Sequence, residues 1–156
     1  MTYLAYVSPS RQIGAGDMTL VADYQTYSDA RSHLKDVFDA TMRGRTVTLR
    51  RDDDVVAVTP VDRLRDYFSR TVAPRISVAR EDGVVVAIME GRPFAAEGTT
   101  IDDAIDELID VLREYAEDWE THLQQAPNHQ DAWGLVQLVR LSSDDQLKVW
   151  MSSDGE

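Results

Sequence analysis

The sequence contains no cysteine and no long uninterrupted hydrophobic run. The lack of cysteine excludes disulfide bonds, thiolate nucleophiles and cysteine-ligated zinc or iron–sulfur clusters. A transmembrane helix needs roughly 20 mostly apolar residues in a row, and neither such a run nor a secretory signal pattern is present. We therefore expect a cytoplasmic protein that does not contact membranes.

Motifs for catalysis and for cofactors are also missing. No glycine-rich phosphate loop and no arrangement typical of a Ser–His–Asp triad stands out from the sequence. The three histidines, His33, His122 and His129, lack the short spacing of metal ligands, and solvated surface positions account for them more simply. We expect a protein that is not an enzyme and has neither a cofactor nor a metal site.

Negative charge is abundant, but it is confined to one half of the chain. The net charge of the 156 residues is −12. Residues 1–71 hold ten Lys or Arg and ten Asp or Glu, whereas residues 72–156 hold six basic and eighteen acidic residues. The neutral half can contact phosphate through its arginines, and the acidic half favours a basic partner over nucleic acid.

The segment 28–68 has the pattern helix, strand, turn, strand, helix. The first helix is expected to begin at the N-cap Ser28 and to end at Gly44, with one apolar side formed by Ala30, Leu34, Val37, Phe38 and Thr41. Strands are expected at Thr46–Leu49 and Val55–Thr59, around a charged turn at 51–54. Thr59 is expected to cap a second helix with Pro60 at its first position, and the apolar stripe of that helix is Val61, Leu64, Tyr67 and Phe68.

Arginines cluster in this small segment. Arg31 falls on the first turn of the expected helix, while Arg50 and Arg51 end a strand. Taken singly, each is more simply a solvated surface residue. A unit of this size buries a core poorly, however, so we expect a homodimer or higher oligomer. A two-fold dimer would present the arginines twice, as contact with a palindromic DNA site requires.

The run YSDAR, an apolar helix, Gly44, the strand VTLRR and the strand VVAVTP together resemble the Phd/YefM antitoxins of bacterial type II toxin–antitoxin systems. The match covers about a third of the chain, from Met18 to about Phe68. It implies a dimerising module that binds operator DNA, and it places DNA contacts on Arg31 and Arg51. Ser28 and Arg50 beside them complete our set of candidate DNA-binding residues. The turn departs from the family pattern. Where the family often has arginine or asparagine with glycine, this chain has Asp52, Asp53 and Asp54, so either these carboxylates point away from DNA or the affinity is modest.

After a boundary between Ser69 and Pro74, the pattern restarts with three strands and one long helix. Strands are expected at Arg75–Arg80, Val84–Met89 and Phe94–Glu97, followed by a helix capped by Thr100 with Asp103 three residues on. A further strand is expected at Trp133–Leu141, and Asp144–Met151 is either a short strand or a helix. These elements predict an α+β protein whose second sheet has three or four strands and packs on the long helix.

The outer side of the long helix is densely acidic. It is either a solvated face or a contact surface for a basic protein, and the residues that we assign to partner binding are Asp102, Asp106, Asp110, Glu114 and Glu117. Trp150 is a further candidate as an exposed partner anchor, although burial in the core is the simpler reading. All the carboxylates share a solvent-facing side, which is a poor arrangement for catalysis.

The passage GVVVAIMEGRPFAAEGTTIDDAIDEL resembles the HicB antitoxin domain, from Arg75 to about Leu123. Many HicB proteins carry their DNA-binding portion after this domain, whereas here it would come before it. The two resemblances imply an N-terminal extension at 1–17, a Phd/YefM-like DNA-binding module at 18–70, a HicB-like toxin-binding module at 75–141 and a tail at 142–156. The extension is an added strand, a partner-binding arm or a disordered tail.

Together these features predict an antitoxin that neutralises a basic RelE-like or HicA-like ribonuclease toxin and represses its own operon by binding operator DNA as a dimer. The alternative is an acidic protein that mimics nucleic acid or acts as a scaffold, and that dimerises and binds a basic partner without binding DNA.

Overall fold

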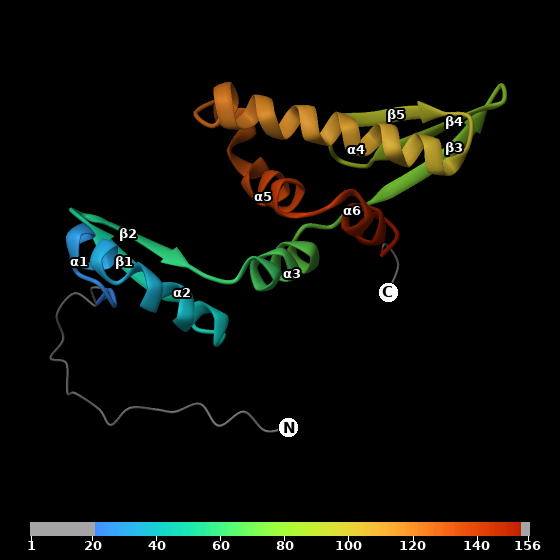
Figure 1. The fold of residues 1–156 in the computed structure, drawn as a ribbon. Helices are drawn as coiled ribbons and strands as arrows, with labels where there is room; N and C mark the ends of the chain where they lie inside the picture. Colours follow the sequence, from blue (N-terminus) through green and yellow to red (C-terminus); the bar gives the residue numbers. More distant parts are fainter. Residues whose placement is uncertain (1–20, 154–156) are drawn as a thin grey trace, which may run out of the picture. The chain divides into compact units, whose positions relative to one another are not determined.

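The computed structural model describes residues 21–153, which divide into two compact units between Val58 and Thr59. Figure 1 shows the helices and strands of each unit. This division comes before the expected boundary between Ser69 and Pro74, because helix α3 (Val61–Thr71) belongs to the second unit. The expectations for residues 1–17 lie outside the described residues. No helix within residues 21–153 is long and apolar enough to cross a membrane.

Unit 1 contains two short helices where the sequence predicted one. Helix α1 (Tyr27–Ser32) and helix α2 (Leu34–Met42) are separated at His33, whose backbone N–H donates to the carbonyl oxygens of Asp29 and Ala30. The expected N-cap, Ser28, is wrong. Thr26 caps α1, since its hydroxyl accepts the backbone N–H of Asp29 at 3.1 Å and so satisfies one of the unpaired donors at the helix start.

A two-stranded antiparallel hairpin completes unit 1. Strand β1 (Val47–Arg51) pairs with strand β2 (Asp54–Val58), and Arg51 lies opposite Asp54. Asp52, in the two-residue turn, has a φ of +52°, a conformation that aspartate tolerates better than most residues. Before α1, Tyr24 forms a parallel bridge to β1, with its N–H donating to the Thr48 carbonyl at 3.1 Å. The buried hydrophobic cluster described in this unit is small and consists of Val37, Ala40 and Val47, while Ala22 and Ala30 are buried outside it.

Unit 2 is built on a three-stranded antiparallel sheet in the order β3-β4-β5, with strands at Ile76–Glu81, Val84–Met89 and Phe94–Gly98. Helix α4 (Ile101–Asp118) packs on β4 and β5 (Figure 1). It also contacts helix α5 (Trp133–Leu141) and helix α6 (Asp144–Met151). Its start is as predicted, because Thr100 and Asp103 form a reciprocal capping box. The buried side of α4 holds Ala104, Leu108, Ile109, Leu112 and Ala116.

The last part of unit 2 is helical. A π-helical turn at Trp119–Leu123 extends α4, a 3₁₀ helix follows at Pro127–Ala132, and the chain ends in helix α5 (Trp133–Leu141) and helix α6 (Asp144–Met151). The strand predicted at Trp133–Leu141 is therefore wrong, and the sheet has no fourth strand within the described residues. Four residues of α5 at helical spacing enter the core, namely Leu135, Val136, Leu138 and Val139. For Asp144–Met151, the helical alternative is the one found.

Helix α3 also differs from its expected start. Pro60 is the N-cap residue, with an extended ψ, and the helix begins at Val61. The apolar proline ring provides no side-chain hydrogen bond to the helix start. The predicted cap at Thr59 with Pro60 inside the helix is therefore one residue early. Of its predicted apolar stripe, Phe68 is buried and Leu64 packs against the core, while Val61 and Tyr67 are largely exposed.

Candidate functional site

The start of α1 and the end of β1 lie together in unit 1. Arg50 Nε donates to Gln25 Oε1 at 3.2 Å, and the guanidinium carbon of Arg51 lies 5.8 Å from the centroid of the Tyr27 ring. The backbone N–H of Arg50 also donates to the Tyr24 carbonyl at 2.8 Å. These contacts bring the strand arginines beside the helix that carries Ser28 and Arg31.

The four predicted DNA-contacting residues do not have equal positions. Ser28, Arg31 and Arg51 are exposed, whereas Arg50 is half-buried and bonded to Gln25. Successive side chains on a strand point to opposite faces, so Arg50 and Arg51 are directed to different sides of the hairpin. Arg31 lies in the last turn of α1 and not in its first, because the helix is short. The exposed set is therefore Ser28, Arg31 and Arg51.

Tyr27 is a member of this cluster that sequence reasoning missed. Its side chain is 60% exposed, and it lies four residues before Arg31, a spacing that makes two side chains neighbours on a helix surface. Tyr27 thus links Arg51, which lies over its ring, to Arg31 on the same helix. The signal in the sequence was an aromatic residue next to Ser28, but its partner is 24 positions away.

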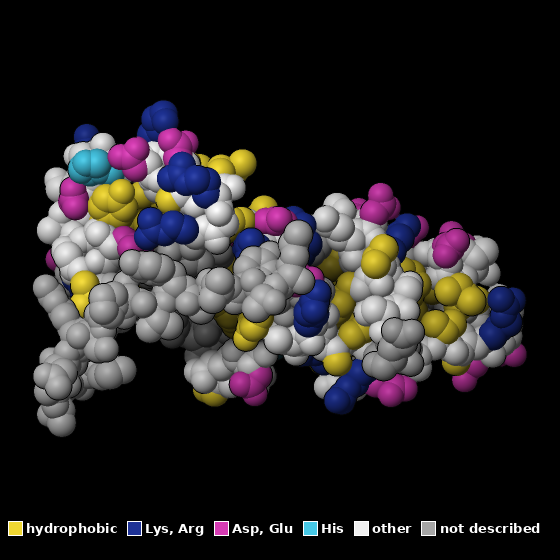
Figure 2. Space-filling model, turned by 90° about the horizontal axis from the view of Figure 1, so that it is seen from below, with side chains coloured by type: hydrophobic (Ala, Val, Ile, Leu, Met, Phe, Trp, Pro, Cys, Tyr) yellow, Lys and Arg dark blue, Asp and Glu magenta, His cyan; other side chains and the backbone are white. Residues whose placement is uncertain are grey.

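The acidic turn stands next to this cluster. Asp52, Asp53 and Asp54 are all exposed, and they form the tip of the hairpin directly after Arg51. Carboxylates at this position repel phosphate. We therefore expect an anion to contact Arg51 on the side that faces α1, away from the acidic tip of the hairpin. Figure 2 shows Lys and Arg side chains interspersed with Asp and Glu on one face of the molecule.

The acidic surface of α4 is present in unit 2, and the five assigned carboxylates are exposed: Asp102, Asp106, Asp110, Glu114 and Glu117. They are not equivalent. Asp106 Oδ1 pairs with Lys148 Nζ at 2.5 Å, and this hydrogen bond is the main reason that the pKa of Lys148 is raised. The negative end of the surface near Asp106 is therefore partly neutralised.

Arg113, the one basic residue of α4, is directed toward the C-terminal end of α5 and the first residue of α6. Its Nη1 donates to the Val139 carbonyl at 2.6 Å, its Nη2 to the Ser142 carbonyl at 2.9 Å, and its Nε to Asp144 Oδ1 at 3.1 Å. No salt bridge forms within residues 21–153 to Asp110, Glu114 or Glu117, which line one side of a shallow depression of about 310 Å³. Asp102 likewise forms no salt bridge within residues 21–153, so Asp106 is the one assigned carboxylate that is paired there.

Trp150 does not form an exposed anchor. Its side chain is 4% exposed, and its indole Nε1 donates to the carbonyl oxygen of Val72 at 2.8 Å. The expectation of an exposed Trp150 is therefore wrong, because burial satisfies both its ring and its polar atom. Among residues 21–153 there is also no group of three or more His, Asp or Glu that could hold a metal ion.

Comparison with known proteins identifies the family. The model of a PHD-like family, described as the antitoxin of a RelE/RelB toxin–antitoxin system, matches residues 22–152 and so spans both units. A crystal structure from Syntrophomonas wolfei subsp. wolfei, of a protein described as an antitoxin part of a proposed toxin/antitoxin system, is similar with a TM-score of 0.70. That match has 20% identity and covers 82% of this chain and 95% of the other, which shows a shared fold. No match was found among curated proteins. The chain belongs to the PHD-like family of antitoxins of toxin–antitoxin systems.

Proposed function

We propose that this antitoxin binds the operator of its own operon as a dimer through unit 1, and neutralises a basic ribonuclease toxin of RelE-like or HicA-like type through unit 2. In this proposal unit 1 corresponds to a Phd/YefM-like module and the sheet and long helix of unit 2 to a HicB-like module. The observation that carries the DNA-binding part is the contact of Arg51 with Tyr27, which places a strand arginine beside the helix that carries Arg31. The antitoxin family points to a regulatory and not a catalytic role.

The charge of the two units supports this division. Residues 1–58 contain seven Lys or Arg and eight Asp or Glu, whereas residues 59–156 contain nine basic and twenty acidic residues. Nearly the whole net charge of −12 therefore belongs to unit 2. A nearly neutral unit can approach DNA through a local arginine cluster, and a strongly acidic unit attracts a protein whose RNA-binding surface is positive.

An exposed apolar stripe on α2 supports dimerisation. Leu34, Phe38 and Met42 are four residues apart, so they lie on one side of the helix, and they are 52%, 59% and 83% exposed. Among residues 21–58, the hydrophobic cluster beneath them contains three buried residues, Val37, Ala40 and Val47. A second copy packed on this stripe would bury apolar surface that unit 1 cannot bury alone, and would present Arg31 and Arg51 twice.

A gel-shift titration with the DNA directly upstream of the gene tests operator binding. Arg31→Ala and Arg51→Ala are expected to weaken binding and to reduce its salt dependence, because each removes a phosphate or base contact. Arg43→Ala is the matched control, since Arg43 is exposed on the same unit at the C-terminal end of α2. If neither salt nor the two test substitutions changes binding, the operator proposal fails and the acidic scaffold without DNA binding is favoured.

Inhibition of a ribonuclease tests toxin neutralisation. The probe is the purified protein encoded by the adjacent reading frame, and the measurement is its RNA cleavage with and without the antitoxin. The triple substitution Asp110→Lys, Glu114→Lys and Glu117→Lys is expected to slow association, because it reverses the charge of the α4 surface. Glu97→Lys, on the exposed part of β5, changes the net charge as much as Glu114→Lys alone and is the control for that single variant. RNA cleavage by the antitoxin alone would contradict the non-enzymatic role.

A further inference from the structure

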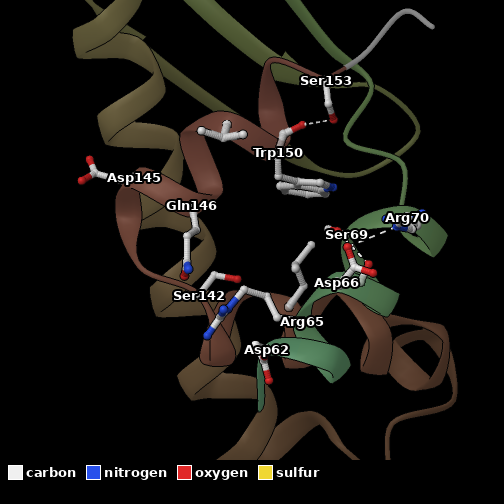
Figure 3. A pocket seen from close by; sticks show the side chains of 12 residues that line it. Asp62, Arg65, Asp66, Ser69, Arg70, Ser142, Asp145, Gln146, Trp150 and Ser153 are labelled. Carbon is white, nitrogen blue, oxygen red and sulfur yellow. Dashed lines mark hydrogen bonds and ion pairs between the residues drawn. The ribbon is translucent and has the colours of Figure 1, made fainter. Parts of the chain in front are cut away.

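Unit 2 contains a groove between α3 and α6, with α5 at its base (Figure 3). Its volume is about 550 Å³, within the range of sites that bind ligands or side chains of a partner. Its lining includes three apolar residues, namely Leu138, Val149 and Trp150, and three aspartates, namely Asp62, Asp66 and Asp145. Figure 3 shows Asp62 and Asp66 on α3 and Asp145 on α6.

The walls of this α3–α6 groove are held by specific hydrogen bonds. Arg65 Nε on α3 donates to the carbonyl oxygen of Leu141 at the end of α5, at 2.7 Å. Trp150 on α6 donates to the carbonyl oxygen of Val72, the C-cap residue after α3, at 2.8 Å. The first bond joins α3 to α5, and the second joins α6 to the C-cap of α3. The groove is therefore already formed in the folded unit, which lowers the cost of binding.

The interior of the groove leaves apolar surface without a partner. Leu138 and Trp150 are almost fully buried, at 1% and 4% exposure, and they form a rigid base. Val149 beside them is 72% exposed, although other apolar residues of α6, such as Leu147 and Met151, are buried in the core. On the face of the molecule seen in Figure 2, hydrophobic side chains are likewise exposed between charged ones. An apolar side chain placed against Val149 would gain contacts on a surface that is already fixed.

The charges around the groove favour a basic occupant. The two arginines of the lining have partners within the unit, since Arg65 bonds to Leu141 and Arg70 Nε pairs with Asp66 Oδ1 at 3.1 Å. Asp62 and Asp145 form no salt bridge within residues 21–153, and Asp145 lies close enough to Lys148, the partner of Asp106, to contribute to the raised pKa of that lysine. The unit as a whole carries eleven more acidic than basic residues. A second copy of this unit would bring like charges together, whereas a Lys or Arg of a partner would face two available carboxylates.

We propose that the α3–α6 groove is the docking site for a basic, amphipathic segment of the toxin. Apolar side chains of this segment pack on Val149, over the base that Leu138 and Trp150 form, and its Lys or Arg side chains pair with Asp62 and Asp145. The inference rests on the proposed function, in which the chain binds a basic toxin. It adds an apolar anchor to the charged α4 surface, which alone would accelerate the encounter more than it would hold the complex.

Binding of the full-length protein to the purified product of the adjacent reading frame tests this site. Val149→Asp is expected to weaken binding by about 10- to 100-fold, mostly through faster dissociation, because it places a carboxylate in the apolar contact. Val78→Asp is the matched control, since Val78 is 44% exposed on β3 and lies outside the groove. The Asp62→Asn and Asp145→Asn double variant is expected to slow association and to reduce its salt dependence.

A photocrosslinker separates a direct contact from an effect on folding. Val149→p-benzoylphenylalanine is expected to crosslink to a toxin segment that contains both apolar and basic residues, which mass spectrometry identifies. Wild-type binding together with unchanged affinity of Val149→Asp, or crosslinks only to a second antitoxin copy, would overturn the groove while leaving toxin binding in place. Absence of any binding by the wild-type protein would instead overturn the proposed function itself, and the groove with it.

Discussion

The indole Nε1 of Trp150 lies 2.8 Å from the carbonyl oxygen of Val72, and this hydrogen bond joins α6 to the C-cap residue of α3. The two residues are 78 positions apart in the sequence. Because Trp150 is almost fully buried, this hydrogen bond is shielded from water and holds one wall of the α3–α6 groove. Trp150 therefore acts through the folding of unit 2.

Trp150→Phe isolates the hydrogen bond, because it keeps an aromatic ring and removes the N–H donor. We expect the free energy of unfolding to fall by about 1–3 kcal/mol, since the Val72 carbonyl loses its partner. Trp150→Ala is expected to cost about 3–5 kcal/mol through the added cavity. Urea unfolding followed by circular dichroism measures both. Trp133→Phe is the control, as Trp133 is 52% exposed, and an equal effect there would show that the indole bond adds nothing.

Arg113→Ala is expected to destabilise unit 2 by about 2–3 kcal/mol, because charged hydrogen bonds to partly buried carbonyls are lost. Arg113 donates to Val139 at 2.6 Å and to Ser142 at 2.9 Å, both at the C-terminal end of α5. Thermal unfolding measures the change. Arg140→Ala is the comparison, since Arg140 forms only an exposed pair with Glu120 and should cost about 0–1 kcal/mol. Similar losses for both would contradict the capping role of Arg113.

Gly98→Ala is expected to distort the junction between β5 and α4. A Cβ atom at this position would lie 2.3 Å from the backbone nitrogen of Ala104, which cannot move without shifting the helix. We expect a loss of about 1–3 kcal/mol or more in the free energy of unfolding. Gly91→Ala serves as control, because its Cβ would meet no atom within 4 Å and its φ of +77° costs only about 1–2 kcal/mol. If Gly98→Ala is the milder change, the close approach is wrong.

The sequence predicted elements well where the signal is local. Helix α4 has an apolar period along its whole length and a Thr100–Asp103 capping box, so its start and its buried side were found. The β3–β4 hairpin was found because Asp82 and Gly83, both at positive φ, supply the turn. In Trp133–Leu141, by contrast, six of the nine residues have large apolar side chains. Such a short run fits a buried strand as well as a buried helix, and only packing on α3 and α4 decides between them.

The candidate sites show the same limit. The exposed arginines and the acidic side of α4 could be predicted, because charge and helical spacing are visible in the sequence. The contact of Arg51 with Tyr27 could not, since it depends on how β1 lies against α1. The direction of Trp150 was likewise open, because a large aromatic residue near the end of a chain suits a core and an interface equally.

Unit 1 is expected to lose stability in acid through Asp23. The backbone N–H of Thr48 donates to Asp23 Oδ2 at 2.9 Å, and this bond, followed by the Thr48 hydroxyl and Arg45, lowers the pKa of the carboxyl group. A carboxyl group whose pKa is lower in the folded protein stabilises the fold when the pH is above its unfolded pKa of about 3.9. This stabilisation is lost as the pH falls through the lower, folded pKa. Asp23→Asn should thus cost stability near pH 7, by less than about 1 kcal/mol because the pair is partly exposed.

Hydrogen exchange of the Thr48 amide measures this effect. The exchange rate of Asp23→Asn is expected to exceed that of the wild type at neutral pH, and the ratio should approach one when the pH falls below the pKa of the folded carboxyl group. A ratio that stays constant with pH would show that the carboxylate charge does not contribute.

Tyr27 is expected to position Arg51 for DNA. Tyr27→Ala removes the ring over which the guanidinium lies, and we expect operator affinity to fall by about 2- to 5-fold, as for an exposed cation–π contact. Tyr27→Phe keeps the ring and should bind nearly as well as the wild type. Because neither change removes a charge, the slope of binding against salt should stay constant, whereas Arg51→Ala should reduce it by about one unit. A gel-shift series over salt concentration separates these effects. Equal affinity of Tyr27→Ala and the wild type would mean that Arg51 reaches DNA without the ring.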